Sequence, residues 1–389
     1  MKRFSRSSLT TMAVCLLFIP ALLKAQPRPA HRKKVGVVLS GGGAKGMAHI
    51  GVLKVIEKAG IPIDYVVGTS MGSIIGGLYS IGYSPEQLDS MVRRQDWTFL
   101  LSDKIPRSEQ NLSERDASQK YVFSIPFGKG VKAEVFGGLI RGQNLANLFS
   151  ELTIGYHDSI NFNKLPIPFA CVSENIVNGN EVNFHEGVLA TAMRASMAIP
   201  GVFTPVRLDS MVLVDGGVVN NYPVNVARAM GADLIIGVDV QSELKPAGEL
   251  NSAGAILGQL VNLMGQDLYK KNLKETTTYI KVNVEGYSAA SFTPSAIDTL
   301  IMRGEEAAMA QDSALMALKS QLGLDSTYMP QPIPSYPYSP ERKVYVKEIT
   351  FDGLDEKDKK WLLKRCDLKE NSEISIRRIE EATAILSAN

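Results

Sequence analysis

The sequence predicts an α/β protein, a three-layer α/β/α sandwich around a mainly parallel sheet. Twice near the start, an apolar strand pattern, residues 35–40 and 65–67, runs into a glycine-containing turn that is followed by an apolar helical pattern. Further apolar runs at 167–172, 212–215 and 233–240 have the length of buried strands. Strands that alternate with helices are typical of a parallel sheet covered on both faces.

The first strand pattern ends in a run of glycines. Residues 41–46 read Gly-Gly-Gly-Ala-Lys-Gly, and the helical pattern after them keeps one apolar face up to Gly60. A glycine-rich loop lets consecutive N–H groups point at one place, and the start of a helix adds partial positive charge. The sequence therefore predicts an anion-binding site in this loop.

Two kinds of anion fit such a loop. Gly41-x-Gly43-x-x-Gly46 matches the dinucleotide fingerprint, which also expects an acidic residue at the end of the second strand. Asp64 precedes that strand, and the turn after it carries Ser70. No Lys-Ser or Lys-Thr pair completes a P-loop either. These features favour an oxyanion hole, which holds the charge that develops on a tetrahedral intermediate.

Ser70 is the candidate nucleophile. It lies in Gly68-Thr69-Ser70-Met71-Gly72, between the second strand pattern and a helix rich in small residues. This strand, turn and helix context is the one that a nucleophile elbow requires. The glycines allow the strand and the helix to approach closely around a strained turn.

A neutral serine hydroxyl needs a base. Asp215 ends an apolar strand pattern and is followed by Gly216 and Gly217, so a buried carboxylate with a raised pKa is one candidate. His185 remains an alternative base, whereas His49 lies within a helical pattern and is interpreted as a packing or hydrogen-bonding residue. No histidine follows position 185, so the order serine, acid, histidine of α/β-hydrolases is not available to an acid beyond that point.

Four blocks occur in the order and with the spacing of patatin-like phospholipases, and the chain resembles that family over residues 35–325. The blocks are the glycine run Gly41 to Gly46, the elbow Gly68 to Gly72, Ala195-Ser196 with Pro200 and Pro205, and Asp215-Gly216-Gly217. The resemblance implies the patatin-like sandwich and a Ser–Asp dyad without histidine. The reaction it implies is the hydrolysis of acyl esters in phospholipids or other lipids, of phospholipase A type, at a membrane surface.

The resemblance also assigns roles by position. Ser70 is the expected nucleophile and Asp215 its base, and no metal or organic cofactor is expected. The oxyanion hole is expected from the backbone amides of Gly42, Gly43 and Ala44. The remaining motif residues support these turns: Gly41, Lys45, Gly46, Gly68, Gly72, Gly216 and Gly217.

The segment that follows the nucleophile helix is expected to cover either the core or an acyl groove. Ser84-Pro85 begins a helix, because serine caps it and proline suits its first position. Residues 97–140 are rich in aromatic side chains, with possible strands at 121–123 and 135–136. Residues 253–274 and 297–322 have helical patterns.

The first 25 residues predict export. Basic residues precede an apolar stretch of about 13 residues, which is too short to span a bilayer and fits a secretory signal peptide. Its removal changes the formal net charge from +2 to −2, so no basic nucleic-acid-binding surface is expected. Cys171 and Cys366, which remain, are expected in different domains and not in a disulfide.

The end of the chain predicts a linker and a second, small domain. Five prolines between 330 and 340 indicate a stiff linker over 329–341, after a catalytic domain at 33–325. Residues 342–389 are expected to form one strand with an unpaired edge and two helices, at 356–366 and 374–388. This order resembles the start of a POTRA domain, which implies an outer-membrane, cell-surface or secreted protein and outer-membrane assembly machinery as a partner. It also leaves a second function open, a cell-envelope transport or scaffold protein with a weakly active or inactive patatin part.

Overall fold

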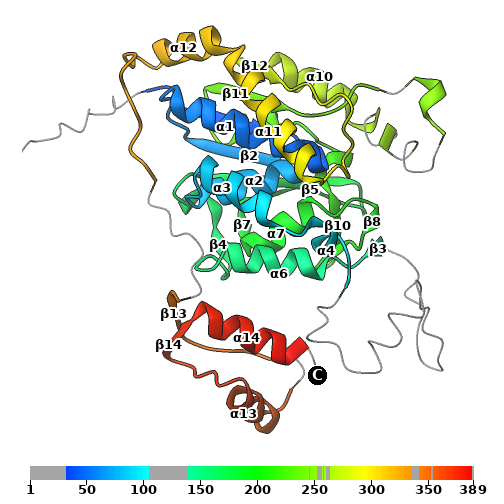
Figure 1. The fold of residues 1–389 in the computed structure, drawn as a ribbon, viewed down its shortest axis with the longest axis vertical. Helices are drawn as coiled ribbons and strands as arrows, with labels where there is room; N and C mark the ends of the chain where they lie inside the picture. The colour runs from blue at the N-terminus through cyan, green and yellow to red at the C-terminus, as the bar shows by residue number, and fades with distance from the viewer. Residues whose placement is uncertain are drawn as a thin grey trace, which may run out of the picture. The chain divides into compact units, whose positions relative to one another are not determined.

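A computed structural model describes residues 32–104, 138–244, 246–251, 256, 258–259, 263–333, 341–351 and 354–387. Its main sheet has the order β12-β11-β1-β2-β5-β10-β9, with β6 paired to the other edge of β5 (Figure 1). These strands are β1 (Val35–Leu39), β2 (Tyr65–Thr69), β5 (Phe169–Asn175), β6 (Asn180–Phe184), β9 (Val206–Leu208), β10 (Met211–Asp215), β11 (Leu234–Asp239) and β12 (Thr278–Lys281).

The middle of the sheet is parallel, as the alternating pattern predicts. Strands β12, β11, β1, β2 and β5 are joined by parallel pairs, while β6, β9 and β10 pair antiparallel. Every residue of β1, β2, β5 and β11 is buried, which explains why these strands read as continuous apolar runs.

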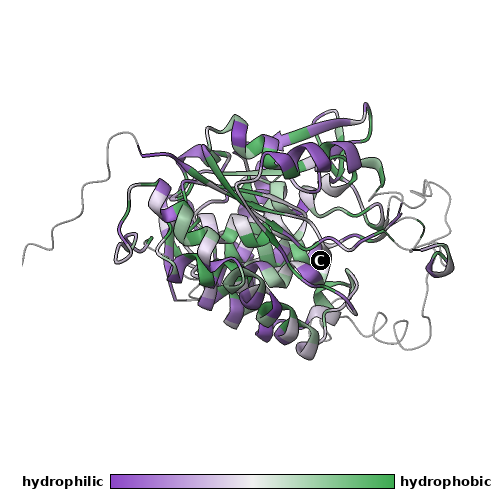
Figure 2. Ribbon diagram, turned by 90° about the horizontal axis from the view of Figure 1, so that it is seen from above, coloured by the Kyte–Doolittle hydropathy of each residue, from purple (hydrophilic) through white to green (hydrophobic). Residues whose placement is uncertain are grey.

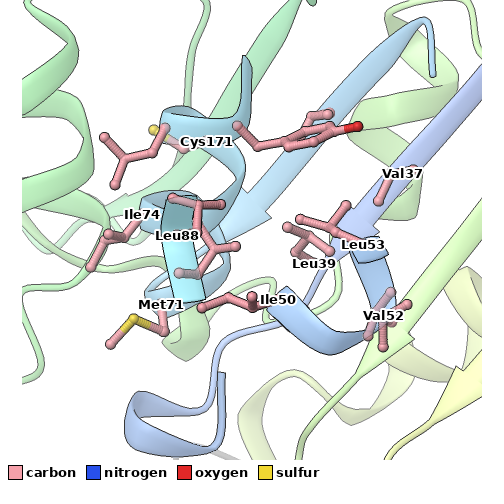
Figure 3. Packing of buried hydrophobic residues seen from close by; sticks show 14 of the residues in the cluster. Val37, Leu39, Ile50, Val52, Leu53, Met71, Ile74, Leu88 and Cys171 are labelled. Carbon is pink, nitrogen blue, oxygen red and sulfur yellow. The ribbon is translucent and has the colours of Figure 1, made fainter. Parts of the chain in front are cut away.

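Helices cover both faces of the sheet, so the predicted three-layer sandwich is confirmed (Figure 1). On one face α1 (Ala48–Lys58), α2 (Met71–Ser80) and α11 (Pro294–Met309) pack on side chains such as Val37 and Leu39. Figure 3 shows Ile50 and Leu53 of α1 near these two residues. On the other face α8 (Val224–Ala229) packs on Val38, because successive side chains of a strand point to opposite faces.

Shorter elements complete this part of the chain. Ser84 caps α3 (Pro85–Arg94) and accepts a hydrogen bond from the Gln87 N–H, so the predicted helix start is correct. The predicted strands at 121–123 and 135–136 lie outside the described residues. The other elements are η1 (Gly43–Met47), α4 (Trp97–Leu100), β3 (Gly138–Ile140), α6 (Gln143–Leu152), β4 (Ile160–Asn161), η2 (Phe162–Lys164), β7 (Glu186–Gly187), α7 (Leu189–Ser196), β8 (Gly201–Phe203), η3 (Gly216–Val218) and η4 (Ala247–Glu249).

The helices in the second half are more broken than the sequence predicts. The pattern at 297–322 forms two helices, α11 and α12 (Asp312–Gln321), which are separated at residues 310–311. Of the pattern at 253–274, α10 (Gln266–Lys274) is continuous, and several residues before it lie outside the described part. In Figure 2, hydrophobic residues gather along the inner elements and hydrophilic residues mark the outer faces of the helices.

The C-terminal part, described by itself, corrects one prediction. The expected single strand, β13 (Lys343–Val346), is paired antiparallel with a second strand, β14 (Ser372–Ser375). The expected helix at 374–388 therefore begins two residues later, as α14 (Ile376–Ser387), after α13 (Glu356–Arg365). The sequence Ser-Glu-Ile-Ser alternates polar and apolar residues and buries only Ile374, which suits a half-buried strand better than a helix. The order strand, helix, strand, helix differs from the expected strand, helix, helix.

A buried lysine joins the end of α1 to the segment that follows α12. Lys319 of α12 is 2% exposed, and its Nζ donates hydrogen bonds to the carbonyl oxygens of Ala59, Ser326 and Tyr328. These acceptors come from the end of α1 and from the segment after α12. Lys319 therefore joins two segments about 260 residues apart.

Replacing Lys319 by methionine is expected to lower the free energy of unfolding by about 2–4 kcal/mol. The methionine fills similar space but leaves three carbonyl oxygens without their donor. Chemical denaturation measures the change, and Lys58→Met, at an exposed position of α1, is the matched control. Equal stability of the two variants would contradict the anchoring role.

Candidate active site

Two strands meet end to end at one edge of β5. Thr69, the last residue of β2, pairs with Val172, and Asp215, the last residue of β10, pairs with Ser173. Because β6 occupies the opposite edge of β5 over residues 171–175, β2 and β10 must share the remaining edge. The parallel strand β2 and the antiparallel strand β10 therefore end against each other, and this places Ser70 beside Asp215.

The backbone of Ser70 is strained in the way a nucleophile elbow requires. Its φ of 55° is in the left-handed region, which few residues other than glycine adopt. The turn is also crowded, because a Cβ on Gly68 would lie 2.2 Å from the Gly72 carbonyl oxygen. A Cβ on Gly72 would lie 2.2 Å from the Leu39 carbonyl oxygen. The two elbow glycines thus let β2, α2 and β1 approach closely.

Ser70 and Asp215 form a direct hydrogen bond. The Ser70 hydroxyl donates to Asp215 Oδ2 at 2.6 Å, and the Gly217 N–H donates to Asp215 Oδ1 at 2.7 Å. Both acceptor oxygens of the carboxylate are therefore oriented. Both side chains are buried, at 5% and 6% exposure.

Ser196 holds the backbone of Ser70 in place. Its hydroxyl accepts a hydrogen bond from the Ser70 N–H at 3.0 Å and donates one to the Val172 carbonyl oxygen at 2.6 Å. It thus holds the turn at the point where β2 leaves β5. The sequence contains Ser196 in its third motif block but gives no reason to assign it this contact.

Burial makes Asp215 a stronger base than an exposed aspartate. Desolvation raises its pKa from 3.8 to about 6, although the hydrogen bonds from Ser70 and Gly217 act in the opposite direction. A carboxylate with this pKa is ionised at neutral pH and still accepts a proton readily. It therefore has the properties of a general base for Ser70.

The histidines lie elsewhere. His49 is fully buried, its Nε2 is bonded to the Ser40 carbonyl oxygen at 2.8 Å, and burial lowers its pKa to about 4. It is a neutral residue that holds the strand before the glycine loop. Burial also lowers the pKa of His185. Among the described residues, neither ring is bonded to Ser70 or Asp215.

The glycine loop offers fewer free donors than the motif predicts. The Ala44 N–H donates to the Ala289 carbonyl oxygen at 2.9 Å, so this predicted oxyanion donor is already occupied in the structure. The N–H groups of Gly42 and Gly43 have no acceptor in the described part of the chain. Gly43 has a φ of 57° and lines the cavity beside Ser70. The two glycine amides are therefore the available donors.

The remaining motif residues support these turns. Lys45 is buried, and its Nζ donates to the Ser242 hydroxyl at 2.8 Å, which ties the loop to the segment after β11. Four of the motif glycines have no room for a side chain, because a Cβ would lie less than 3 Å from a neighbouring atom. They are Gly41, Gly46, Gly216 and Gly217.

An apolar cavity of about 330 Å³ opens beside Ser70. Its walls come from one face of α2, from α6, and from residues 289–292. Trp97 and Phe292 both line it and stack on each other, with ring centroids 4.8 Å apart. The aromatic segment expected over a core or a groove thus lines this cavity where the structure describes it. Sequence patterns did not reveal the contributions of α6 and of residues 289–292.

The cavity follows α2 away from the serine. Ile74 and Leu78 line it, and Leu78 lies about 12 Å along the helix axis from Ser70, at 1.5 Å per residue. Leu152, the last residue of α6, also lines it, and its carbonyl oxygen accepts a hydrogen bond from Tyr83 just beyond α2. The cavity therefore runs between two helices from Ser70 towards Leu78 and Leu152.

The fold and the site define an α/β sandwich in which a strained turn serine is bonded to a buried aspartate. A family model described as patatin-like phospholipase matches residues 37–228. The chain therefore contains a patatin-like phospholipase domain, which includes the glycine loop, Ser70 and Asp215.

Known proteins match this domain over part of their length. The chain is 31% identical to "Lysophospholipase NTE1" of Candida albicans over 221 residues, which are 55% of this chain and 14% of that protein. It is 32% identical to "Patatin-like phospholipase domain-containing protein 6" of Mus musculus over 211 residues, 54% of this chain and 14% of that protein. The "Uncharacterized NTE family protein Rv1063c" of Mycobacterium tuberculosis is 29% identical over 230 residues, 59% of this chain and 55% of that protein. The chain thus spans at most about half the length of these relatives.

Among solved structures, VipD from Legionella pneumophila matches with a TM-score of 0.39 and 18% identity. This match covers 74% of this chain and 67% of VipD.

If Asp215 is the base, kcat/KM should rise with pH and level off above about 6. Below that pH the carboxyl is protonated and does not accept the serine proton, so kcat/KM should fall about tenfold per pH unit. The pH profile of ester hydrolysis measures this limb. His185→Gln is the control, because the limb should remain in that variant, and its disappearance would assign the titration to the histidine.

Proposed function

We propose that this chain is a serine hydrolase of lipid acyl esters, of phospholipase A type. One observation carries the proposal: the hydroxyl of Ser70 donates a hydrogen bond to Asp215 at 2.6 Å, and Ser70 lines an apolar cavity. The names of two relatives, a lysophospholipase and a phospholipase domain protein, support the same chemistry.

In the proposed reaction, Asp215 accepts the proton of Ser70 while the serine oxygen attacks the ester carbonyl carbon. The N–H groups of Gly42 and Gly43 stabilise the negative charge on the carbonyl oxygen. When the tetrahedral intermediate collapses, the bond to the leaving alcohol breaks, and Asp215 returns the proton to that alcohol. A water then attacks the acyl-serine with Asp215 again as base, and the carboxylic acid and free serine are released.

The cavity defines the acyl side of the substrate. Its lining side chains are almost all apolar, so an acyl chain gains about 0.8 kcal/mol for each methylene that it buries there. Among the described residues of this lining, no side chain is charged, so none of them offers an ion-pair partner to a charged headgroup. The acyl chain is therefore proposed to lie along α2, with the leaving alcohol outside.

We also propose that the protein is exported, as residues 1–25 suggest. These residues lie outside the described part of the chain. None of the described helices has both the length and the apolar character needed to cross a bilayer.

A placement at the outer membrane remains a proposal from the sequence alone, and the observed order of the C-terminal elements adds no support for a POTRA domain. The scaffold alternative gains no support either, because the hydrogen bond between Ser70 and Asp215 favours the proposed catalytic role.

Replacing Ser70 by alanine should abolish ester hydrolysis and covalent labelling by a fluorophosphonate. The loss of a covalent nucleophile costs several orders of magnitude, and the variant should stay folded because the removed hydroxyl is not a packing contact. Turnover of a p-nitrophenyl ester and mass spectrometry of the labelled peptide are the measurements. Asp215→Asn should be nearly as inactive, while His185→Gln should keep most of its activity. Residual hydrolysis by a clean Ser70→Ala preparation would refute the assignment.

Replacing Leu152 by alanine should shift the substrate preference towards longer acyl chains. The change opens space at the far end of the cavity, and each methylene that is newly accommodated is worth about 0.8 kcal/mol, or roughly fourfold in kcat/KM. The ratio of kcat/KM for a long-chain and a short-chain p-nitrophenyl ester is measured. Leu53→Ala, a buried leucine of α1 outside the cavity lining, is the control for lost stability. The same ratio in both variants would show that the acyl chain lies elsewhere.

A further inference from the structure

The segment after Asp215 contacts each of the other two parts of the site. The Asn220 carbonyl oxygen accepts a hydrogen bond from the Thr69 hydroxyl at 2.9 Å, next to the nucleophile. The Asn221 carbonyl oxygen accepts one from the Gly41 N–H at 3.2 Å, at the start of the glycine loop. The base, the nucleophile turn and the glycine loop are therefore joined within one stretch of seven residues, 215–221.

The side chain of Asn221 lies between the glycine loop and the Asp215 turn. A Cβ on Gly41 would stand 2.2 Å from Asn221 Oδ1, and a Cβ on Gly217 would stand 2.8 Å from the same oxygen. The hypothetical Gly41 Cβ would also be 3.1 Å from the Ser70 Cβ. The amide of Asn221 thus fills the space that the two missing side chains leave, directly beside the dyad.

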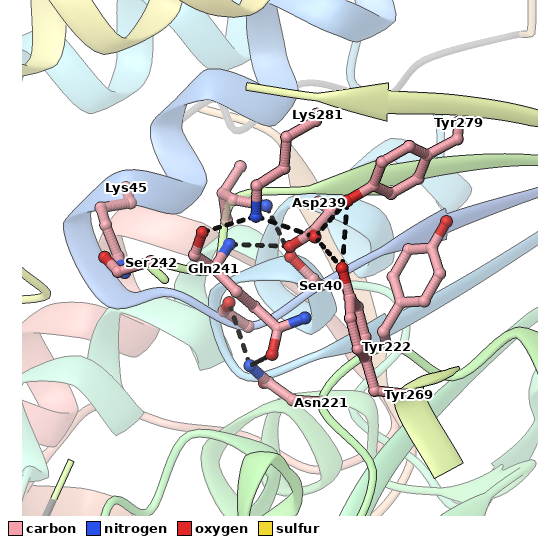
Figure 4. Close-up of polar contacts among 12 residues, drawn as sticks. Ser40, Lys45, Asn221, Tyr222, Asp239, Gln241, Ser242, Tyr269, Tyr279 and Lys281 are labelled. Atoms are coloured by element: carbon pink, nitrogen blue, oxygen red, sulfur yellow. Dashed lines mark hydrogen bonds and ion pairs between the residues drawn. The ribbon is translucent and has the colours of Figure 1, made fainter. Parts of the chain in front are cut away.

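The other end of the amide is held by hydrogen bonds. Asn221 Nδ2 donates to Gln241 Oε1 at 2.9 Å and, more weakly, to the Gly41 carbonyl oxygen at 3.4 Å (Figure 4). Gln241 is anchored in turn, because its N–H donates to Asp239 Oδ1 at 2.8 Å and its carbonyl oxygen accepts from Lys281.

Asp239 is the fixed point behind Gln241. This carboxylate is fully buried at the end of β11 and accepts hydrogen bonds from Tyr269, Tyr279 and Lys281 (Figure 4). Burial opposes the charged form of Asp239, but the positive charge of Lys281 and the hydrogen bonds hold the pKa of this carboxyl below its usual value. The chain of contacts from Asp239 through Gln241 to Asn221 therefore starts from a rigid, charge-paired group.

We propose that Asn221 is a positioning residue that sets the distance between the glycine loop and the Ser70–Asp215 pair. This inference rests on the proposed function, in which the amides of Gly42 and Gly43 and the dyad act on the same carbonyl group. A displacement of about 1 Å between such groups costs roughly a hundredfold in rate, so the spacing must be held by packing and not by a mobile loop. Asn221 supplies that packing beside the dyad, and it is not among the described residues that line the acyl cavity.

The first test compares Asn221→Ala with Asn225→Ala. Asn225 accepts hydrogen bonds from Asn220 and Asn272 in the same polar cluster, but no contact joins it to Gly41 or Gly217 in the described residues. Asn221→Ala should lower kcat and the rate of Ser70 labelling by a fluorophosphonate about 10- to 100-fold, with KM within about threefold. Asn225→Ala should keep kcat within about threefold of the unmodified protein, even if its melting temperature falls as much as that of Asn221→Ala.

The second test uses Asn221→Asp, which keeps the shape of the side chain. The new carboxylate would face Asp215 across the Gly217 turn. The other charged groups nearby are Asp239 and Lys281, which form a direct ion pair, and Glu181, which accepts a hydrogen bond from Asn220. A Cβ on Gly217 would lie 2.8 Å from Asn221 Oδ1 and 3.0 Å from Asp215 Oδ1, so the two carboxylates would be close neighbours. Their repulsion should move the acid limb of Ser70 labelling up by at least about half a pH unit. A merely structural role would lower the melting temperature without moving this limb.

These experiments separate the inference from the proposed function. An unchanged kcat in Asn221→Ala, an equal loss of kcat in Asn225→Ala, or an unmoved acid limb in Asn221→Asp would each overturn the positioning role. Absence of Ser70 labelling in the unmodified protein would instead overturn the proposed function.

Discussion

The site depends on one constraint, the single edge of β5 that β2 and β10 share. A parallel strand that arrives from one end and an antiparallel strand that arrives from the other must stop where they meet, and their last residues are Thr69 and Asp215. The proposed nucleophile, Ser70, follows the first, and the proposed base, Asp215, ends the second. A slip of one residue in either register would turn the side chains to the opposite face of the sheet and separate the pair.

The same constraint explains why the site needs unusual backbone. The chain must leave β2 sharply to avoid β10, which accounts for the positive φ of Ser70 and for the crowding around Gly68 and Gly72. Such strain costs about 1–3 kcal/mol and persists only where the surroundings enforce it. Ser196 and the Asn220 carbonyl oxygen are those surroundings, since they bind the Ser70 N–H and the Thr69 hydroxyl.

Local sequence signals revealed the parts of this site that depend on neighbouring residues. Strand, glycine turn and helix patterns are local, so β1, β2, β5, β10 and β11, the Ser70 turn and Asp215 were predictable, whereas β9 and β12 were not predicted. The structure brings Ser70 and Asp215 together. Contacts between residues that are far apart in the sequence were not predictable from these patterns. Ala289 reaches the Ala44 N–H from 245 residues away, and the lining from α6 and Phe292 depends on tertiary packing. In the C-terminal part, residues 374 and 375 of the predicted helix instead belong to β14, because β14 pairs with β13.

The sheet also separates two environments around the dyad. On the side of α2 the lining is apolar and suits an acyl chain, whereas on the side of α8 and α10 the packing includes Asn221, Gln241 and the charge-paired Asp239. A base in the first environment alone would lose its charge, and an apolar chain would not bind in the second. Asp215 stands between them, buried enough for a pKa of about 6 and oriented by the Gly217 N–H. This position suits the base of the proposed dyad without histidine, because a carboxylate at such a boundary is both basic and ionised at neutral pH.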